Sequence, residues 1–477
     1  MIPKTILFGL VVILIAYYYD PIVWKRLVKK LKLKEEPWEV RIANAWDQQI
    51  TEPHLQKKRI AVGVNVNADL IVSGTELFEK LNLRPSGKKE DHSVLISLAD
   101  LEETFSFYFE KGAGVERFFA DQKGFNDILQ AAHNLKEKHY FVGGNAALIA
   151  LTIASSFPDV EILLIGPTGP KVQSLLSSNI RTPASSKREQ DEVHLILEYS
   201  KGEVWGDAVT PVATRFITSH DIANSEMEAL TGFAENVRAF NPDVVVFSGL
   251  HLLDGQEPEF QAQRISNLLD QLDQLPKHIP VHLELASMAD KNLVTQLFSQ
   301  VVGQVHSLGL NEQELSLIAK VTGLADDLAV TNGHPEIPQV ADILVALLRS
   351  KRKSTLTRIH FHCLTYHIIA TRKGSWANTA SAVAAGTRVA GMQACQDETI
   401  VPDKVELRVP KRAIAISDSP MHGDRLQFQP DKPTLKWEIS NIEIYFSPVL
   451  VCKEPLKTVG LGDAISGTGL VYSDFVS

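Results

Sequence analysis

The sequence predicts an α/β protein, with a doubly wound, mostly parallel sheet and a smaller β-rich lid. Three observations support this prediction. Short apolar runs rich in β-branched residues recur along the chain, helical patterns separate several of them, and one middle segment is strand-like without helical partners. Hydrophobic residues make up 44% of the 477 residues, which is enough to cover a large sheet on both faces.

Apolar runs with the character of parallel strands define the predicted sheet. They cover residues 59–66 (RIAVGVNV), 160–165 and 244–248. Residues 281–285 alternate apolar and polar side chains, which is the period of a strand, and residues 259–272 have a helical pattern. Residues 140–142 form a short strand that breaks at Gly143-Gly144-Asn145, where an alanine-rich helical run begins. This alternation favours a mostly parallel sheet with helices on both faces.

The middle of the chain has a different character. Residues 181–207 are first polar and then strand-like (VHLILEY), without a clear helical partner. We expect inserted segments, including residues of about 181–220, to build the lid.

The N-terminus contains an apolar run from Ile6 to Tyr19. With the residues that follow, the run approaches the ~20 residues that cross a bilayer. Tyrosines at its end occupy the place where a signal peptidase site needs small residues, which argues against cleavage. A basic cluster follows the run, and by the positive-inside rule this cluster places the main domain in the cytosol. We expect residues 1–37 to be an anchor in the endoplasmic reticulum membrane with a basic linker, and residues 38–477 to be the globular domain. The alternative is a cleaved secretory signal, which would make the protein secreted or lumenal.

Charge and cysteine content narrow the function classes. A net charge of −9 argues against a nucleic-acid-binding protein, which normally carries a basic excess. The chain has an odd number of cysteines, three, and no N-x-[ST] sequence. Both features favour a reducing compartment without glycosylation for the folded part.

The sequence Gly460-Leu461-Gly462-Asp463 is the strongest chemical signal. Two glycines before a helix free the backbone to approach an anion, and the exposed amides and the helix dipole favour a phosphate there. Asp463 is placed to take a proton from an attacking hydroxyl, as a general base. Alone, the pattern is equally compatible with a glycine turn whose aspartate caps the helix. A P-loop is excluded because Thr468 stands where lysine is needed, and a dinucleotide fingerprint because Ile465 stands where glycine is needed.

Acidic side chains follow two predicted strands at the edge where ligands collect in α/β sheets. Glu284 ends one strand, and Glu314 follows Asn311, a candidate helix cap. Mg²⁺ needs only one or two carboxylates beside water and phosphate oxygens, so this pair is a candidate metal site. The structural alternatives are a strand-end salt bridge for Glu284 and a solvated helix face for Glu314.

Polar residues near two other strand ends are candidates for binding sugar hydroxyls. Asn65, Asn67 and Asp69 alternate after the first strand and share one face, and Gly143-Gly144-Asn145 closes another strand. Turn formation explains each of them equally well.

Taken together and in order, these motifs resemble those of the ADP-dependent glucokinases of the ribokinase-like superfamily. The motifs are N-x-N-x-D (Asn65, Asn67, Asp69), GGN (143–145), HLE (282–284), NEQE (311–314) and GLGD (460–463). The resemblance covers most of the chain from about Arg59 to the end, and GLGDAISG and SLGLNEQEL look like the animal members.

The resemblance implies a ribokinase-like α/β domain whose lid closes over the sugar. It implies a kinase of glycolysis that transfers the terminal phosphoryl group of ADP to the 6-hydroxyl of D-glucose, giving glucose 6-phosphate and AMP, with Mg²⁺ as cofactor. Asp463 would be the general base and would organise Mg²⁺ with Glu284 and Glu314. The sugar would be held by Asn67, Asp69, Glu116, Gly143, Gly144 and Asn145, and phosphate by Arg215, Gly460, Leu461 and Gly462. His360 and His362 alternate along a strand and are interpreted as structural.

Two alternatives stay open on the sequence. An ADP-dependent phosphofructokinase of the same fold would want extra basic residues around the sugar site. A non-catalytic nucleotide-binding protein would not need Asp463 and both glutamates. The preference for ADP over ATP is implied by the resemblance alone.

Overall fold

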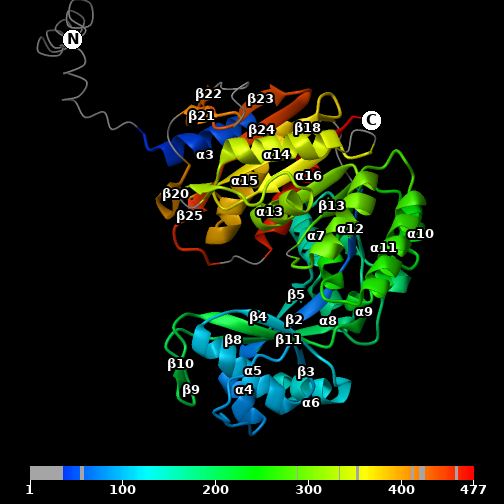
Figure 1. Cartoon of the computed structure of the whole chain (residues 1–477), viewed down its shortest axis with the longest axis vertical. Helices are drawn as coiled ribbons and strands as arrows, with labels where there is room; N and C mark the ends of the chain where they lie inside the picture. The colour runs from blue at the N-terminus through cyan, green and yellow to red at the C-terminus, as the bar shows by residue number, and fades with distance from the viewer. Residues whose placement is uncertain are drawn as a thin grey trace, which may run out of the picture.

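The structure is a computed structural model that describes residues 36–53, 59–286, 288–331, 334–350, 354–409, 413–417, 425–456 and 460–476. These residues form a large upper lobe and a smaller lower lobe in Figure 1. Residues 1–35, which hold the apolar run of the expected anchor, lie outside the described residues. Among the helices that the structure describes, none is long and apolar enough to span a bilayer.

The large lobe is built on one ten-stranded sheet. In spatial order the strands are β23 (Leu435–Ile439), β24 (Ile442–Pro448), β18 (Tyr366–Arg372), β17 (Arg358–His362), β14 (Ser307–Asn311), β13 (Val281–Glu284), β12 (Val244–Ser248), β1 (Arg59–Val64), β6 (Glu161–Ile165) and β7 (Ile180–Arg181). From β17 to β7 in this order, all neighbouring strands pair in parallel. The strands β18, β24 and β23 extend the sheet beyond β17 with antiparallel pairings.

Both faces of this sheet are buried, as the near-continuous apolar runs predict. In β1, Ile60 and Val62 belong to one core cluster, while Ala61 and Val64 belong to the other. The first cluster includes side chains of α7 (Asn145–Ser156) and α16 (Leu461–Tyr472), and α15 (Thr379–Cys395) packs on α16. The second includes α10 (Phe233–Phe240), α11 (Pro258–Asp273), α12 (Lys291–Gln296), α13 (Glu312–Val321) and α14 (Ile337–Ser350). The sheet is therefore doubly wound.

The smaller lobe, which we call the lid, contains a six-stranded mixed sheet. Its order is β3 (Val94–Leu95), β4 (Val115–Phe119), β11 (Thr214–Ser219), β8 (Val193–Tyr199), β2 (Asn67–Ser73) and β5 (His139–Gly143). The segment expected from about residue 181 to 220 supplies β8 and β11, but residues 67–143 supply the other four strands. β7 at the start of that segment pairs with β6 in the large sheet instead.

The two faces of the lid sheet have different chemistry because side chains alternate along each strand. One face carries Leu70, Leu195 and Phe216, which pack on α4 (Gly74–Lys80), α5 (Leu98–Lys111) and α6 (Gln122–His133). The opposite face carries Asp69, His194 and Arg215, the neighbours of those apolar residues in sequence, and it lines a cavity. The pleat thus separates a packed lid core from a polar surface.

Most strand and helix predictions are confirmed, with differences at their ends. The first strand stops at Val64 because Asn65 and Val66 cross from the large sheet to the lid. The helical run after Gly143-Gly144 is α7, and the pattern at residues 259–272 is α11.

The expectation of reduced cysteines is wrong for two of the three. Cys395, at the end of α15, forms a disulfide with Cys452 in β25 (Leu450–Cys452), and only Cys363 remains free and buried. An odd count allows one pair and one free thiol, so the count alone did not establish the redox state. A disulfide is typical of an oxidising compartment.

Reduction of this disulfide is expected to lower the midpoint of thermal unfolding. The bond closes a loop over a separation of 57 residues. For such a loop, chain-entropy arguments give about 4 kcal/mol of stabilisation. Thermal unfolding of the full chain with and without dithiothreitol measures the effect. A Cys395→Ser/Cys452→Ser variant should not respond to the reductant, and equal midpoints for both proteins in both conditions would contradict the prediction.

Candidate active site

Two cavities meet at Asp463. The larger, of about 520 Å³, lies in the large lobe at the carboxyl ends of β13, β14 and β17. The smaller, of about 390 Å³, lies between the polar face of the lid and the large lobe. Asn145, Gly460 and Asp463 line both cavities. A side chain at this junction can act on ligands held in either one.

The start of α16 places backbone amides at the same junction. Gly460 is the N-cap with φ of 72°, a left-handed conformation that glycine adopts without steric cost. The amides of Leu461, Gly462 and Asp463 have no acceptor within the helix, since Ala464 donates the first helical hydrogen bond, to Gly460. The alternative that Asp463 caps the helix is wrong, because the helix begins two residues before it.

Asp463 is buried, with 5% of its surface exposed. Asn145 Nδ2 donates to both carboxylate oxygens, at 3.2 and 3.4 Å. Burial is the largest effect on this group, and together with the charge of Glu284 it raises the pKa of Asp463 to about 7, against the opposing effect of Asn145. A carboxylate with such a pKa is a stronger base than an ordinary aspartate.

Glu284 ends β13 in a buried polar environment. His282 Nε2 lies 3.0 Å from Oε2, and His362 Nε2 lies 3.6 Å from Oε1. Burial alone would raise the pKa of Glu284, but its interactions with His282 and His362 lower it to about 2. A Cβ on Gly309 of β14 would overlap the Glu284 carboxylate, so glycine there makes room for the charge.

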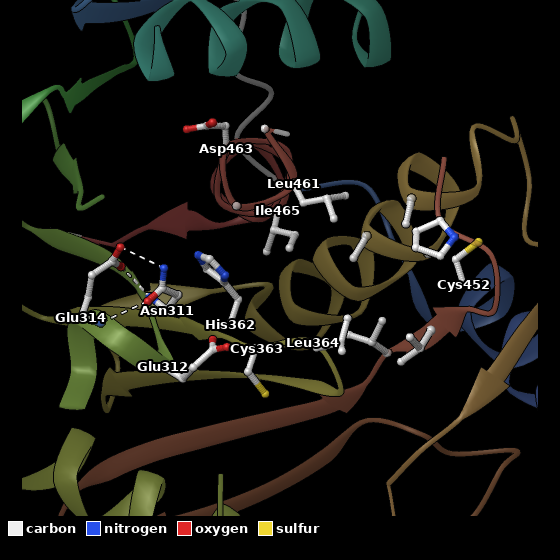
Figure 2. A pocket seen from close by; sticks show the side chains of 18 of the residues that line it. Asn311, Glu312, Glu314, His362, Cys363, Leu364, Cys452, Leu461, Asp463 and Ile465 are labelled. Atoms are coloured by element: carbon white, nitrogen blue, oxygen red, sulfur yellow. Dashed lines mark hydrogen bonds between the residues drawn. The ribbon is translucent and has the colours of Figure 1, made fainter. Parts of the chain in front are cut away.

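Glu314 lies in the first turn of α13, and Asn311 caps that helix as predicted. Asn311 Oδ1 accepts from the Glu314 amide, and Glu314 Oε2 accepts from the Asn311 amide at 2.7 Å, a capping box visible in Figure 2 beside His362. The alternative of a solvated helix face is wrong, because Glu314 is only 6% exposed. Burial, helped by the charge of Glu284, raises the pKa of Glu314 to about 7.

These three carboxylates suit a hard divalent cation. They supply oxygen donors only, and the charge of Glu284 disfavours ionisation of both Glu314 and Asp463, a repulsion that a dication relieves. Among the described residues, the group of three whose possible ligand atoms all lie within 4.8 Å of one another is instead Glu90, His92 and Glu103. It lies in the lid away from both cavities, and Lys88 and His92 already pair with Glu103.

The larger cavity changes from polar to apolar away from Asp463. The carboxylates lie at one end, and Leu364 and Cys452 lie at the other in Figure 2. The apolar part is lined by Leu285, Leu364, Ala390, Val449, Val451, Cys452, Pro455, Leu461 and Ile465. Such a cavity can hold a flat apolar group at one end and an anionic group at the other.

The smaller cavity is lined by polar groups from the lid. Asn67 Nδ2 donates to Asp69 Oδ1 at 2.7 Å, and burial is the main cause that raises the pKa of Asp69. Glu116 of β4 and Arg215 of β11 lie on the same face. A Cβ on Gly143 would overlap both Asp69 and Asn67, so this glycine supports the cavity from behind rather than lining it.

The structure brings the predicted site residues together around the junction. Asn67, Asp69, Glu116, Gly144, Asn145, Arg215, Gly460 and Asp463 line the smaller cavity, and Glu284, Glu314, Leu461 and Gly462 line the larger. Sequence reasoning missed His194, Asp221 and His251 in the smaller cavity. His362, which we interpreted as structural, lines the larger cavity beside Glu284. The polar residues within the apolar strand VHLILEY were the available signal for His194, and the polar alternation of RIHFH was the signal for His362.

Comparison with known proteins identifies the family. Residues 58–472 match the ADP-specific phosphofructokinase/glucokinase conserved region. The chain belongs to this family. It is 46% identical over 443 residues to the ADP-dependent glucokinase of Bos taurus, covering 91% of this chain and 88% of that protein. It is 36% identical over 486 residues to the probable ADP-dependent glucokinase of Caenorhabditis elegans, covering 99% and 94%.

Solved structures of this family have the same fold. A phosphofructokinase from Pyrococcus horikoshii, solved with AMP, has a TM-score of 0.67 at 18% identity, covering 88% of this chain and 98% of that one. A last common ancestor of ADP-dependent phosphofructokinases from Methanosarcinales has a TM-score of 0.65 at 19% identity, covering 91% and 97%. The predicted ribokinase-like α/β fold is confirmed.

Substituting Gly143 by alanine is expected to destabilise the protein. The new Cβ would overlap the Asp69 and Asn67 side chains. Overpacking of this kind costs about 1–3 kcal/mol. Thermal or urea unfolding measures the change, with Gly303→Ala as control, because a Cβ there meets only Ser354 Cβ at 3.4 Å. Equal losses of stability in the two variants would contradict the predicted overlap of the new Cβ with Asp69 and Asn67.

Proposed function

We propose that this chain transfers the terminal phosphoryl group of ADP to the 6-hydroxyl of D-glucose, giving glucose 6-phosphate and AMP. The observation that carries the proposal is the position of Asp463, which lies with the first amides of α16 where the two cavities meet. The named activity of the bovine relative, 46% identical over most of both chains, supports the same reaction.

Asp463 takes the proton from the sugar hydroxyl as its oxygen attacks phosphorus. The sugar oxygen forms a bond to the β-phosphorus of ADP. The bond from the β-phosphorus to the oxygen that bridges the two phosphates breaks, and this bridging oxygen leaves as part of AMP. The amides of Leu461, Gly462 and Asp463 stabilise the charge on the transferring group. The hydrogen bonds from Asn145 fix the orientation of the carboxylate during the transfer.

Mg²⁺ is the proposed cofactor, with Glu284, Glu314 and Asp463 as the residues that would hold it, directly or through water. When bound, it supplies positive charge that offsets the charge of the phosphates. Because Glu314 already accepts two hydrogen bonds from Asn311, we assign it to a contact through water.

The larger cavity suits ADP. Its apolar end fits the adenine ring, and the diphosphate would extend toward the amides of α16. Arg215 of the lid lines the smaller cavity and is proposed to contact phosphate. Closing the lid would exclude water and so suppress hydrolysis of the nucleotide.

The smaller cavity favours a neutral sugar over a sugar phosphate. Among the described residues that line it, Arg215 is the only lysine or arginine, while Asp69, Glu116 and Asp221 are acidic. With Arg215 assigned to the phosphate of the nucleotide, a second phosphate group would meet three acidic side chains and no further lysine or arginine among these described residues. This favours glucose over fructose 6-phosphate, and the complete set of catalytic acids argues against a non-catalytic binding protein.

Residues 1–37 are proposed to anchor the kinase in a membrane, in the endoplasmic reticulum. Of the two orientations, the disulfide between Cys395 and Cys452 favours the lumenal one over the cytosolic one. Protease protection of the kinase domain in sealed microsomes distinguishes the two orientations.

Replacing Asp463 by asparagine is expected to lower kcat about 10²–10⁴-fold, because the general base is lost while the shape is kept. The assay follows glucose phosphorylation by the full chain with ADP or ATP and Mg²⁺. The wild type should use ADP and not ATP. The exposed Asp159→Asn variant should match the wild type. Nucleotide binding without turnover on glucose would contradict the proposal, and turnover on fructose 6-phosphate instead would favour the phosphofructokinase alternative.

Binding of Mg²⁺ is expected to release protons near pH 7. The pKa values of Asp463 and Glu314 are both about 7 without metal, so each carboxyl is about half protonated there, and a cation favours the ionised forms. Proton release should therefore be largest near pH 7 and vanish near pH 9. Calorimetry in buffers of different ionisation enthalpy measures it. Asp463→Asn should release fewer protons, and an unchanged release would contradict the assignment.

A further inference from the structure

Arg358 is a fully buried cation at the first position of β17. Burial lowers its pKa to about 9, so the side chain is still charged at pH 7. Nη1 donates to Ser307 Oγ at 2.8 Å, while Nε and Nη2 meet no acceptor among the described residues. The guanidinium carbon lies 5.5 Å from the ring centroid of Trp376. A buried charge is costly unless it is hydrogen-bonded, so the bond to Ser307 is the contact that orients this cation.

The register of the large sheet places Ser307 between Arg358 and His282. β14 lies between β17 and β13, and Ser307 is paired with Arg358 on one side and with His282 on the other. Ser307 Oγ lies 2.8 Å from His282 Nδ1, and His282 Nε2 lies 3.0 Å from Glu284 Oε2. Three consecutive hydrogen bonds therefore join Arg358 to Glu284, and all four side chains are at most 3% exposed.

The chemistry of arginine sets the direction of each hydrogen bond in this series. A guanidinium can only donate, so Ser307 Oγ accepts from Arg358, and the hydroxyl hydrogen of Ser307 is left for His282 Nδ1. Nδ1 then accepts, so a neutral imidazole carries its proton on Nε2 and donates it to Glu284 Oε2. In an imidazolium both nitrogens would donate, and the Ser307 hydroxyl would have no acceptor within the described part of the chain. The neutral ring with its proton on Nε2 is thus the form in which the serine and the imidazole are both satisfied.

The hydrogen bond from His282 engages one of the two oxygens of Glu284. Oε2 accepts it and lies over Gly309, where a Cβ would overlap this oxygen. Oε1, which lies 3.6 Å from His362 Nε2, is left for a cation or for a water molecule that the cation holds. With the imidazole proton on Nδ1 instead, the lone pair of Nε2 would face Oε2 and repel it. The tautomer of His282 therefore decides whether Glu284 keeps this orientation.

We infer that Arg358 is a positioning residue for the metal-binding carboxylate: through Ser307 it fixes the tautomer of His282, and His282 fixes Glu284. The inference rests on the proposed function, since it needs Mg²⁺ at Glu284. A direct effect of charge would act in the opposite direction, because a cation nearby weakens the binding of a second cation. Partners that orient a metal ligand typically contribute about 10–100-fold in metal affinity. The hydrogen bonds thus predict that Arg358 strengthens metal binding.

The test measures the affinity of the full chain for Mn²⁺, a spectroscopic substitute for Mg²⁺, by electron paramagnetic resonance. Ser307→Ala and Arg358→Met should each weaken Mn²⁺ binding about tenfold or more, and should raise the Mg²⁺ concentration that half-saturates glucose phosphorylation by a similar factor. At saturating Mg²⁺, kcat and the KM for glucose should stay close to the wild-type values. The double variant should lose no more affinity than Ser307→Ala alone, because Arg358 acts through that serine.

Two further variants separate positioning from stability. Ser307→Thr keeps the hydroxyl and should restore most of the Mn²⁺ affinity that Ser307→Ala loses. Ser106→Ala is the matched control, because Ser106 is a buried serine of the lid that accepts from Trp205 Nε1 at 2.9 Å and donates to Glu102 Oε1 at 2.8 Å. It should lower the midpoint of thermal unfolding and leave Mn²⁺ affinity unchanged.

The tautomer is read directly by ¹⁵N nuclear magnetic resonance of the metal-free protein with labelled histidine. The signal of His282 is identified by its absence in His282→Gln, and in the wild type its proton should lie on Nε2. This measurement needs no change at Arg358, so it decides the direction of the bonds even where Arg358→Met does not fold.

A proton on Nδ1 in the wild type would overturn the inference. Wild-type Mn²⁺ affinity in Ser307→Ala or in Arg358→Met would also overturn it, as would a further loss in the double variant. A wild type that has the predicted tautomer but neither binds Mn²⁺ nor phosphorylates glucose would instead show that the proposed function is wrong, and the role of Arg358 in metal binding would fall with it.

Discussion

The burial of Asp463 in the first turn of α16 is the constraint on which the site depends. A carboxylate removed from water and placed near Glu284 is costly to ionise, and this cost raises its pKa to about 7. The same helix turn leaves three amides without an acceptor inside the helix. The chain therefore brings together a basic carboxylate and a helix start that is suited to binding an anion. Asn145, Gly309 and the capping box of Asn311 and Glu314 are the local features that maintain this arrangement.

Much of the fold could be predicted because β-branched runs and helical periods are local signals. Residues 59–64, 244–248 and 259–272 formed the expected elements, since parallel strands and their covering helices are apolar over their whole length. The glycines and Asp463 could be located because anion binding at a helix start requires that pattern. The position of the helix start itself could not, because Gly460 as N-cap depends on a left-handed conformation that sequence alone does not fix.

The remaining site residues could not be predicted because strand order decides their neighbours. His194 contacts Glu116 and Asp221 only because β8 lies between β11 and β2, and β11 pairs with β4. His362 reaches Glu284 because β17 and β13 both flank β14. Residues 67–143 were not assigned to the lid for the same reason, since their strands pair with segments far along the chain. The disulfide of Cys395 and Cys452 likewise depends on α15 and β25 packing together.

The central claim is that Asp463 accepts the proton of the attacking sugar hydroxyl at the junction of the two cavities. A crystal structure of the full chain with glucose, AMP, Mg²⁺ and aluminium fluoride as a mimic of the transferring phosphoryl group tests it most directly. The account predicts an Asp463 carboxylate oxygen within about 2.6–3.2 Å of the sugar 6-hydroxyl, with the amides of Leu461 and Gly462 on the fluoride. A hydroxyl that contacts another base, or a fluoride group bound away from α16, would contradict it.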